Sequence, residues 1–326
     1  MNDRPLVSAI IPTYNRGYTV GRAVESILKQ TYENIEVIVV DDGSTDDTQE
    51  KLKEYGDRIR VLYQRNSGPG PARNRGIEAS RGEIIAFLDS DDVWLPTKLA
   101  RQVSLFQRAP TYVPCCLCNS IPSAAGHGEA SLFDINLLKP TCDEGLWLNV
   151  TDVLATRFVL FCQLVAIRRE ALESTGYFDE SLRFMEDYDL ALRLSLEGPW
   201  GLIREPLAII NWIPADSFSL KASKEEVCLE QYVLKTRERV FATLRSGNQA
   251  ATGLGYLKRA IKKARRDLWG ARLRGSNYWS ARIVGSLFKG LERCRMAIFR
   301  RSPCFPRVKA VPIESGESLP VALSQM

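Results

Sequence analysis

The chain has only one histidine, His127, among its 326 residues. Three of its eight cysteines, Cys115, Cys116 and Cys118, lie close together, but no second Cys or His pair at metal-ligand spacing accompanies them. A structural zinc centre normally needs two such pairs, so we expect none. The cysteine cluster instead predicts a buried strand over residues 112–118 with reduced thiols, which fits a reducing cytoplasm.

The sequence also lacks an apolar run long enough to cross a membrane. The best candidate, residues 153–167, is interrupted by Arg157 and Gln163, whereas a membrane-spanning helix needs about 20 apolar residues. The first residues lead directly into a predicted strand, so we expect no secretory leader. Hydrophobic residues make up 45% and charged residues 25%, as in ordinary globular proteins. We therefore expect a cytoplasmic protein with one large domain and a smaller extension.

The formal net charge of +5 is unevenly distributed along the chain. Sixteen Lys and Arg stand against two acids between residues 258 and 309, whereas the first 257 residues carry a net charge of −7. Aromatic and aliphatic residues are interleaved with the basic ones over 258–301, which is typical of helices that lie on an anionic membrane surface. A helical extension with a solvated basic face is the alternative. No nucleic-acid-binding module is visible, so we expect no nucleic-acid partner.

The first hundred residues alternate continuous apolar runs with segments of helical periodicity. Apolar runs separated by helices indicate a parallel sheet that is covered on both faces. The predicted strands are 7–11, 35–40, 59–63 and 84–88. The predicted helices are 19–30, a helix capped by Ser44 or Thr45 that ends near Tyr55, 72–80 and 96–108.

The remaining two thirds of the sequence are less regular. Residues 119–150 read as a loop-rich insertion, and helices are predicted over 187–196 and 224–246. Residues 203–212 predict a closing edge strand, which tolerates Pro206 near its start. We therefore divide the chain into an α/β domain, a helical basic extension and a disordered tail, which cover residues 1–222, 223–309 and 310–326.

Polar clusters follow the predicted strands at 12–15, 41–44, 66–71 and 89–92. In an open parallel sheet, ligands bind outside the carboxyl ends of the strands, so the four clusters predict one binding site. The last cluster holds three carboxylates, whose mutual repulsion a divalent cation can offset. Oxygen ligands suit Mg²⁺ or Mn²⁺, which would in turn hold a diphosphate. Taken alone, this cluster could also be an acidic, solvated turn.

In this order the motifs resemble those of the family 2 glycosyltransferases of the GT-A type, over roughly residues 5–215. They read VSAIIPTYNR at 7–16, VVDDGSTD at 39–46, ARNRG at 72–76 and FLDSDD at 87–92. The resemblance implies a Rossmann-like α/β fold with a mostly parallel sheet. It also implies inverting transfer of a sugar, expected to be a hexose, from a nucleotide-diphosphate donor to a hydroxyl group. The expected donor carries uridine. The expected acceptor is a saccharide or a lipid-linked molecule in surface polysaccharide or glycolipid synthesis, at the inner face of the membrane.

The resemblance assigns nucleotide binding to Pro12, Tyr14, Asp42 and Arg73. Asp42 would accept a hydrogen bond from the base, and Tyr14 would form an apolar wall against it. The alternatives are a turn or helix-capping role for Asp42 and core packing for Tyr14. Arg73 would reach the nucleotide or its phosphates, and a surface salt bridge is the alternative.

The resemblance also assigns the metal and the chemistry. Asp91 would bind Mn²⁺ or Mg²⁺, and Asp89 would contact the ribose or metal-bound water. Asp92 would lie near the donor sugar or would cap the following segment. Asp187 would be the general base and Glu186 would position it or the acceptor. Because Asp187 begins a helix, we expect the helix dipole to favour its ionised form and to prevent a strongly raised pKa.

Two departures from the family pattern concern the sugar and the diphosphate. Residues 176–180 read GYFDE, with Tyr177 after Gly176 where the family has a second glycine, which would reshape the sugar pocket. Residues 210–213 hold no histidine where family members often carry one, so Ser217 and Ser219 remain as phosphate donors. A non-catalytic protein that binds nucleotide sugars is therefore the alternative. The intact Asp89/Asp91 and Glu186/Asp187 pairs favour the enzyme.

Overall fold

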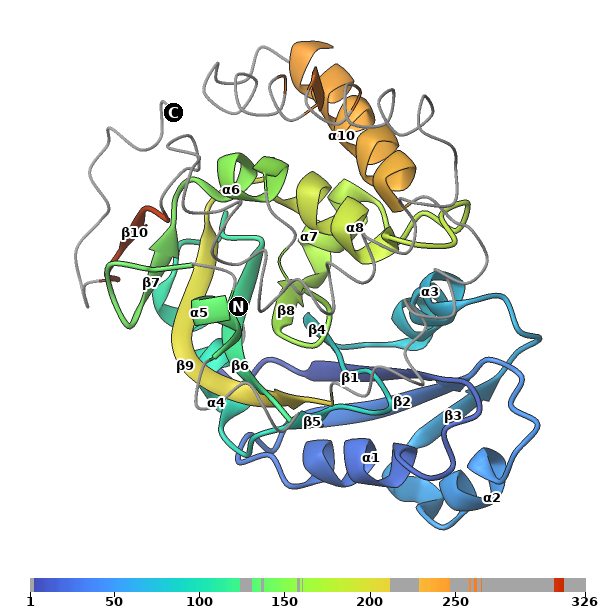
Figure 1. The fold of residues 1–326 in the computed structure, drawn as a ribbon. Coiled ribbons are helices and arrows are strands. Elements are labelled where there is room, and N and C mark those ends of the chain that lie inside the picture. Colours follow the sequence, from blue (N-terminus) through green and yellow to red (C-terminus); the bar gives the residue numbers. More distant parts are fainter. Residues whose placement is uncertain are drawn as a thin grey trace.

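The computed structural model describes residues 3–123, 131–135, 138–156, 159, 161–211, 229–246, 258, 261–262, 265 and 308–313. Within these residues one sheet runs in the order β10-β7-β9-β6-β8-β4-β1-β2-β3, and β5 pairs with β9 beside this path (Figure 1). The strands are β1 (Val7–Thr13), β2 (Ile35–Asp41), β3 (Arg60–Tyr63), β4 (Ile84–Phe87), β5 (Val93–Trp94), β6 (Cys115–Pro122), β7 (Glu144–Trp147), β8 (Val165–Arg168), β9 (Trp200–Ile210) and β10 (Ala310–Val311).

Helices cover both faces of this sheet, as Figure 1 shows for α1 and α3 on opposite sides of β1 and β2. The helices are α1 (Val20–Leu28), α2 (Thr48–Lys53), α3 (Pro69–Ala79), α4 (Lys98–Arg108), α5 (Leu132–Ile135), α6 (Val150–Thr156), α7 (Arg169–Thr175), α8 (Glu186–Leu194) and α10 (Leu229–Ser246), with a 3-10 turn at Gly56–Arg58. The expected α/β fold with a mostly parallel sheet on the N-terminal side is confirmed.

The N-terminal half contains the predicted parallel strands. β1 lies between β2 and β4, and β3 pairs with the outer side of β2, all in parallel. β1 and β4 are buried along their whole length, which explains their uninterrupted apolar sequences. α3 packs closely on this layer, because a Cβ atom at Gly76 would lie 2.4 Å from Cγ2 of Ile10. The carboxyl ends of β1, β2 and β4 therefore meet at one edge of the sheet, beside the start of α3.

The second half of the sheet corrects the prediction for β9. This strand lies between β6 and β7 rather than at an edge, and it begins at Trp200. Pro206 fits an inner strand because the pairing with β6 shifts register on both sides of Asn119, its partner residue. The predicted end of this strand at Trp212 lies outside the described residues.

Other boundaries also differ from the prediction. α2 begins at Thr48 with no side-chain cap, so neither Ser44 nor Thr45 caps it. Instead the Ser44 hydroxyl accepts a hydrogen bond from the backbone N–H of Asn15, at 2.9 Å. The cysteine cluster does lie on a buried strand, β6, with free thiols. The predicted insertion holds the end of this strand together with α5 and β7, and His127 lies outside the described residues.

Among the described residues of the C-terminal part of the chain, α10 and β10 contact the domain. α10 packs against α8, with Val240 buried (Figure 1). β10 pairs antiparallel with β7, although its residues belong to the stretch expected to be disordered. Most of the basic segment and the boundary at residue 222 lie outside the described residues, so the predicted domain limits stay predictions. None of the described helices has the length and hydropathy that crossing a membrane requires.

Candidate functional site

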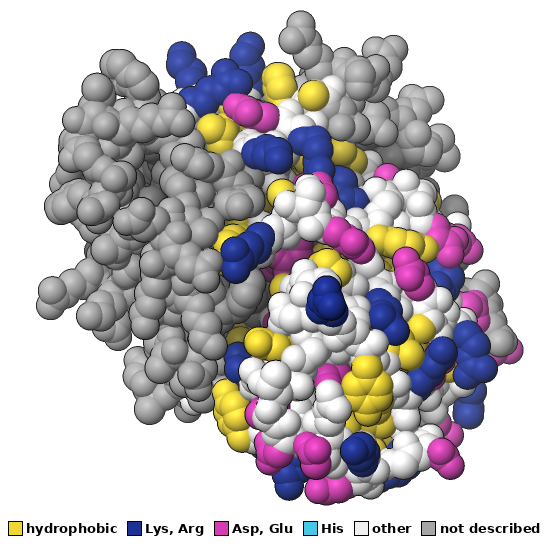
Figure 2. Space-filling model, turned by 90° about the vertical axis from the view of Figure 1, so that its right-hand side faces the viewer, with side chains coloured by type: hydrophobic (Ala, Val, Ile, Leu, Met, Phe, Trp, Pro, Cys, Tyr) yellow, Lys and Arg dark blue, Asp and Glu magenta, His cyan; other side chains and the backbone are white. Residues whose placement is uncertain are grey.

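The predicted polar clusters converge where the parallel strands end. The N–H of Thr45, beyond β2, donates to Oδ1 of Asn15, beyond β1, at 2.7 Å. The Arg16 guanidinium lies 3.6 Å from the Asp91 carboxylate, beyond β4. Three loops that are distant in sequence therefore form one surface. Figure 2 shows the side of the molecule that carries β3 and α3, where a group of acidic side chains lies in a recess of the surface.

Arg73 is the centre of the site. It lies one turn inside α3, and its guanidinium donates to Oε1 of Glu186 at 2.9 Å and to Oδ1 of Asp89 at 2.8 Å. Its side chain is only 6% exposed, so the alternative of a surface salt bridge is wrong. Burial lowers the pKa of Arg73, but the neighbouring negative groups raise it well above its ordinary value. Arg73 thus joins the end of β4 to the start of α8.

The acidic cluster after β4 divides into three roles. Asp89 accepts hydrogen bonds from Arg73 and, through its other oxygen, from the Gln163 side-chain amide. Asp91 keeps a side-chain exposure of 31%, and burial together with the charge of Asp89 raises its pKa. Asp92 is buried and accepts the N–H of Asn211 at 2.7 Å, which ties this loop to the end of β9. This contact favours a structural role for Asp92 over the predicted contact with the sugar.

A divalent cation fits the donor set at Asp91. No cluster of three or more His, Cys, Asp or Glu suited to a metal occurs among the described residues. Mg²⁺ is commonly bound by one or two carboxylates together with substrate phosphates, and does not need a cage of protein ligands. Asp91 offers such a carboxylate with exposure left, whereas both oxygens of Asp89 already accept hydrogen bonds.

Glu186 and Asp187 begin α8, directly after Met185, which has a positive φ of 63°. Glu186 is buried against Arg73, whereas Asp187 keeps partial exposure. Burial, and next the charge of Glu186, raise the pKa of Asp187 to about 7. The expectation that the helix dipole prevents a strongly raised pKa was wrong, because desolvation outweighs the dipole here. A carboxylate that changes protonation near neutral pH is suited to act as a general base.

Asp42 holds the loop that precedes α3. Its carboxylate accepts hydrogen bonds from the side chain of Gln64 at 2.7 Å and from the backbone N–H groups of Ser67 and Gly68, both at 2.8 Å. Tyr14 is 45% exposed, which argues against core packing, whereas Pro12 is buried on β1. The Tyr14 ring is therefore partly exposed at the surface. The Asp42 carboxylate holds the loop before α3 through its hydrogen bonds to Gln64, Ser67 and Gly68.

The Gly176–Glu180 segment lies against α3. Gly176 has a φ of 81°, a backbone conformation that glycine adopts without strain. Asn74 fixes the segment, because its amide donates to the carbonyl of Phe178 at 2.9 Å and accepts the N–H of the same residue at 3.0 Å. The Phe178 ring lies 5.4 Å from the Arg73 guanidinium. The segment therefore packs against the Arg73 guanidinium through the Phe178 ring. The predicted phosphate donors Ser217 and Ser219 lie outside the described residues.

Sequence reasoning missed Asn74 and Gln163. Asn74 stands inside the ARNRG motif, so its place beside Arg73 gave a local signal. Gln163 gave none, because its contact with Asp89 spans 74 residues of sequence. Only the pairing of β4 with β8 brings the two side chains together.

Comparisons with known proteins find glycosyltransferases. The model of glycosyl transferase family 2 matches residues 8–165. An uncharacterized glycosyltransferase of Rickettsia prowazekii, RP339, is 36% identical over 187 residues, which are 57% of this chain and 57% of that protein. The Escherichia coli protein WfgD, named UDP-Glc:alpha-D-GlcNAc-diphosphoundecaprenol beta-1,3-glucosyltransferase, is 45% identical over 105 residues, 32% of this chain and 42% of its own. The chain thus spans less than two thirds of the length of these curated relatives.

Solved structures share the fold. Residues 1–349 of TarS from S. aureus, in complex with UDP-GlcNAc, align with a TM-score of 0.63 and 17% identity, over 87% of this chain and 76% of that one. The mannosyltransferase PcManGT from Pyrobaculum calidifontis, in complex with GDP-Man and Mn²⁺, aligns with a TM-score of 0.56 and 20% identity, over 92% and 84%. At this identity the likeness shows the fold alone.

Proposed function

We propose that this chain, which carries a family 2 glycosyltransferase domain on a GT-A fold, transfers a sugar from a nucleotide-diphosphate donor to a hydroxyl group. The observation that carries the proposal is Arg73, which bridges the acidic loop after β4 and the carboxylate pair that begins α8. Such a bridge places a cation-binding carboxylate and a base at one site, as group transfer from a diphosphate requires.

A UDP-linked donor and a lipid-linked acceptor are our specific expectations. They are supported by the names of the E. coli relative, which pairs UDP-Glc with a diphosphoundecaprenol acceptor, and of the TarS complex with UDP-GlcNAc. The GDP-Man complex of PcManGT shows that this fold also serves another nucleotide. We expect Tyr14 and Asp42 to contact the base, and Tyr177 to border the sugar.

In the proposed mechanism the chain's residues orient the reactants and move one proton. Asp187 in its ionised form takes the proton of the acceptor hydroxyl, while that oxygen forms a bond to the anomeric carbon. The bond from this carbon to the diphosphate oxygen breaks, and its electron pair leaves with the diphosphate. Attack from the opposite face inverts the anomeric centre. Asp91 would hold Mn²⁺ or Mg²⁺, which supplies Lewis-acid stabilisation of the leaving group when bound.

Thermal unfolding with UDP tests the donor site. UDP with Mn²⁺, at about 100 times the dissociation constant, is expected to stabilise the fold by about 2.7 kcal/mol, because it binds only the folded state. For a protein of this size we expect a melting temperature about 5–10 °C higher. UDP alone and Mn²⁺ alone are expected to give smaller shifts in melting temperature, because the cation neutralises the diphosphate and the diphosphate supplies oxygen ligands to the cation.

Asp91→Ala is the matched variant for this measurement, and Asp143→Ala is its control, since the Asp143 side chain is 92% exposed. The shift is expected to disappear in the first variant and to persist in the second. A shift with GDP or dTDP in place of UDP would change the donor and keep the proposal. No shift with any nucleotide would favour a different function for the fold.

The basic segment 258–301 is our proposed contact with an anionic membrane surface, in keeping with a lipid-linked acceptor. Removing residues 258–326 is expected to abolish co-sedimentation with vesicles that contain anionic lipid, with neutral vesicles as the control. Equal sedimentation of the shortened and the full chain would contradict a membrane role for this segment.

A further inference from the structure

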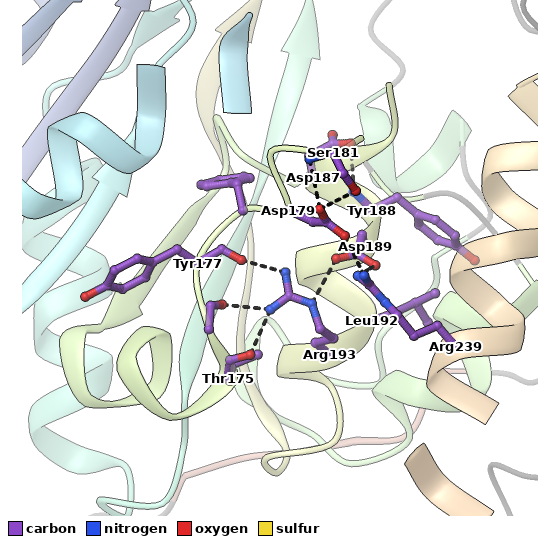
Figure 3. A network of polar contacts seen from close by, with 12 residues as sticks. Thr175, Tyr177, Asp179, Ser181, Asp187, Tyr188, Asp189, Leu192, Arg193 and Arg239 are labelled. Carbon is purple, nitrogen blue, oxygen red and sulfur yellow. Dashed lines mark hydrogen bonds and ion pairs between the residues drawn. The ribbon is translucent and has the colours of Figure 1, made fainter. Parts of the chain in front are cut away.

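Asp189 is a fully buried carboxylate on α8, two residues after Asp187. A buried charge is costly unless it is paired and hydrogen-bonded, so its partners must be fixed in place. One oxygen accepts a hydrogen bond from Nε of Arg193 at 2.8 Å, and the other pairs with Arg239 of α10 (Figure 3). α10 therefore compensates part of the buried charge on α8, the helix that carries the proposed base.

Arg193 uses its remaining nitrogens to hold the backbone beside the site. Its guanidinium donates to the carbonyl oxygens of Thr175 at 2.8 Å, Gly176 at 2.7 Å and Tyr177 at 2.7 Å. Figure 3 shows the contacts with Thr175 and Tyr177. We call residues 175–181 the clamp loop. Its first half is thus tied to Asp189 through an arginine of the same helix.

Arg239 ties the second half of the clamp loop to the same carboxylate. One of its terminal nitrogens donates to Oδ2 of Asp179, and the other pairs with Asp189. Although burial raises the pKa of Asp179, hydrogen bonds from Ser181 and Arg239 lower it to about 2, so the group is ionised at neutral pH. The planar guanidinium bridges two carboxylates in a geometry that an ammonium group cannot reproduce.

The clamp loop connects this pairing to the proposed site through Phe178, which precedes Asp179. The Phe178 ring lies 5.4 Å from the Arg73 guanidinium and packs edge-on against Phe87, the last residue of β4, at 5.3 Å. Arg73 in turn holds Asp89 and Glu186. A shift of Asp179 would therefore displace the Phe178 ring, which packs against the Arg73 guanidinium.

We propose that Arg239 is a positioning residue for sugar transfer, which sets the clamp loop and the start of α8 from outside the family 2 match. The proposal rests on the function proposed above. α10 makes a second contact with α8, because Nε of Arg237 donates to the hydroxyl of Tyr188, the residue after Asp187, at 3.1 Å. Through Arg237 and Arg239, α10 thus contacts the elements that carry the proposed site.

The test compares Arg239→Ala and Arg239→Lys with Lys235→Ala, which removes the same charge from an exposed position one turn earlier on α10. Because small misplacements of reacting groups can cost up to about 100-fold, we expect Arg239→Ala to lower kcat about 10- to 100-fold. The KM for the donor is expected to stay within about 2-fold. Arg239→Lys is expected to restore only part of kcat, and Lys235→Ala to leave it unchanged.

Hydrogen exchange of the peptide that covers residues 175–181 gives a readout that needs no turnover. Arg239→Ala is expected to speed its exchange at least about 10-fold, since the loop loses one anchor. Unchanged kcat, or unchanged exchange, in a folded Arg239→Ala variant overturns the proposal, and Arg239→Lys decides if the alanine variant does not fold. If the unaltered chain transfers no sugar, the proposed function fails and the positioning role with it, whereas exchange alone still shows whether Arg239 holds the loop.

Discussion

Asp187→Asn is expected to reduce sugar transfer at least about 100-fold while donor binding stays near normal. Asparagine keeps the size of the side chain, and the N–H of Tyr188 that now donates to Asp187 at 2.7 Å can donate to the amide oxygen. The amide cannot accept the acceptor's proton, so only the chemical step is lost. Steady-state kcat and the thermal shift with UDP and Mn²⁺ measure the two effects separately.

The pH dependence of transfer tests the same assignment. The raised pKa of Asp187 keeps this carboxyl protonated below about pH 7, and only the ionised form can take a proton. We therefore expect kcat/KM to rise as pH increases through about 7. Asp57→Asn, at an exposed position, is the control. Unchanged turnover in Asp187→Asn would remove this residue from the mechanism.

Arg73→Ala is expected to destabilise the fold by about 3 kcal/mol and to abolish transfer. Removal of one partner from a buried ion pair leaves a charge without compensation, which typically costs about 3–5 kcal/mol. We take the lower end because Glu186 is buried whereas the side chain of Asp89 is 28% exposed. Urea unfolding followed by tryptophan fluorescence measures the free energy of unfolding.

Arg81→Ala is the control for this loss of charge. Arg81 also pairs with a carboxylate, that of Glu36 at 3.4 Å, but its side chain is 79% exposed. Exposed pairs contribute about 0–1 kcal/mol, so we expect a small change. Equal effects of the two substitutions would show that Arg73 does not hold a buried pair, and the proposed site would lose its centre.

The N-terminal part of the site could be predicted because its residues follow strands that are obvious in the sequence. β1, β2 and β4 are apolar on both faces, which indicates a parallel sheet, and parallel strands place their carboxyl ends at one edge. The convergence of Asn15, Ser44 and Asp91 follows from this rule without further information. The pair Glu186 and Asp187 came from resemblance to a family and not from a pattern of that kind.

Partners of the central residues could not be predicted, because local patterns carry no information on distant pairing. Arg73 and Glu186 are 113 residues apart, and the sequence left a surface salt bridge open where the structure has a buried pair. The prediction for β9 failed for a related reason. Proline has no backbone N–H to donate to a neighbouring strand, so Pro206 predicted an edge strand. In the structure the pairing of β9 with β6 shifts register on both sides of Asn119, the partner of Pro206, so the regular hydrogen bond is not needed there.

The sequence by itself determined the alternation of strands and helices from β1 to β4, the edge of the sheet that carries polar residues, and the carboxylates proposed to bind a cation. These features depend on periodicity and on chain direction, which are local. Only the tertiary structure decided the pKa of Asp187, the burial of Arg73 and the part that Arg239 takes in holding the clamp loop. Each depends on which groups exclude water from a charge or compensate it, and these come from segments up to 113 residues away.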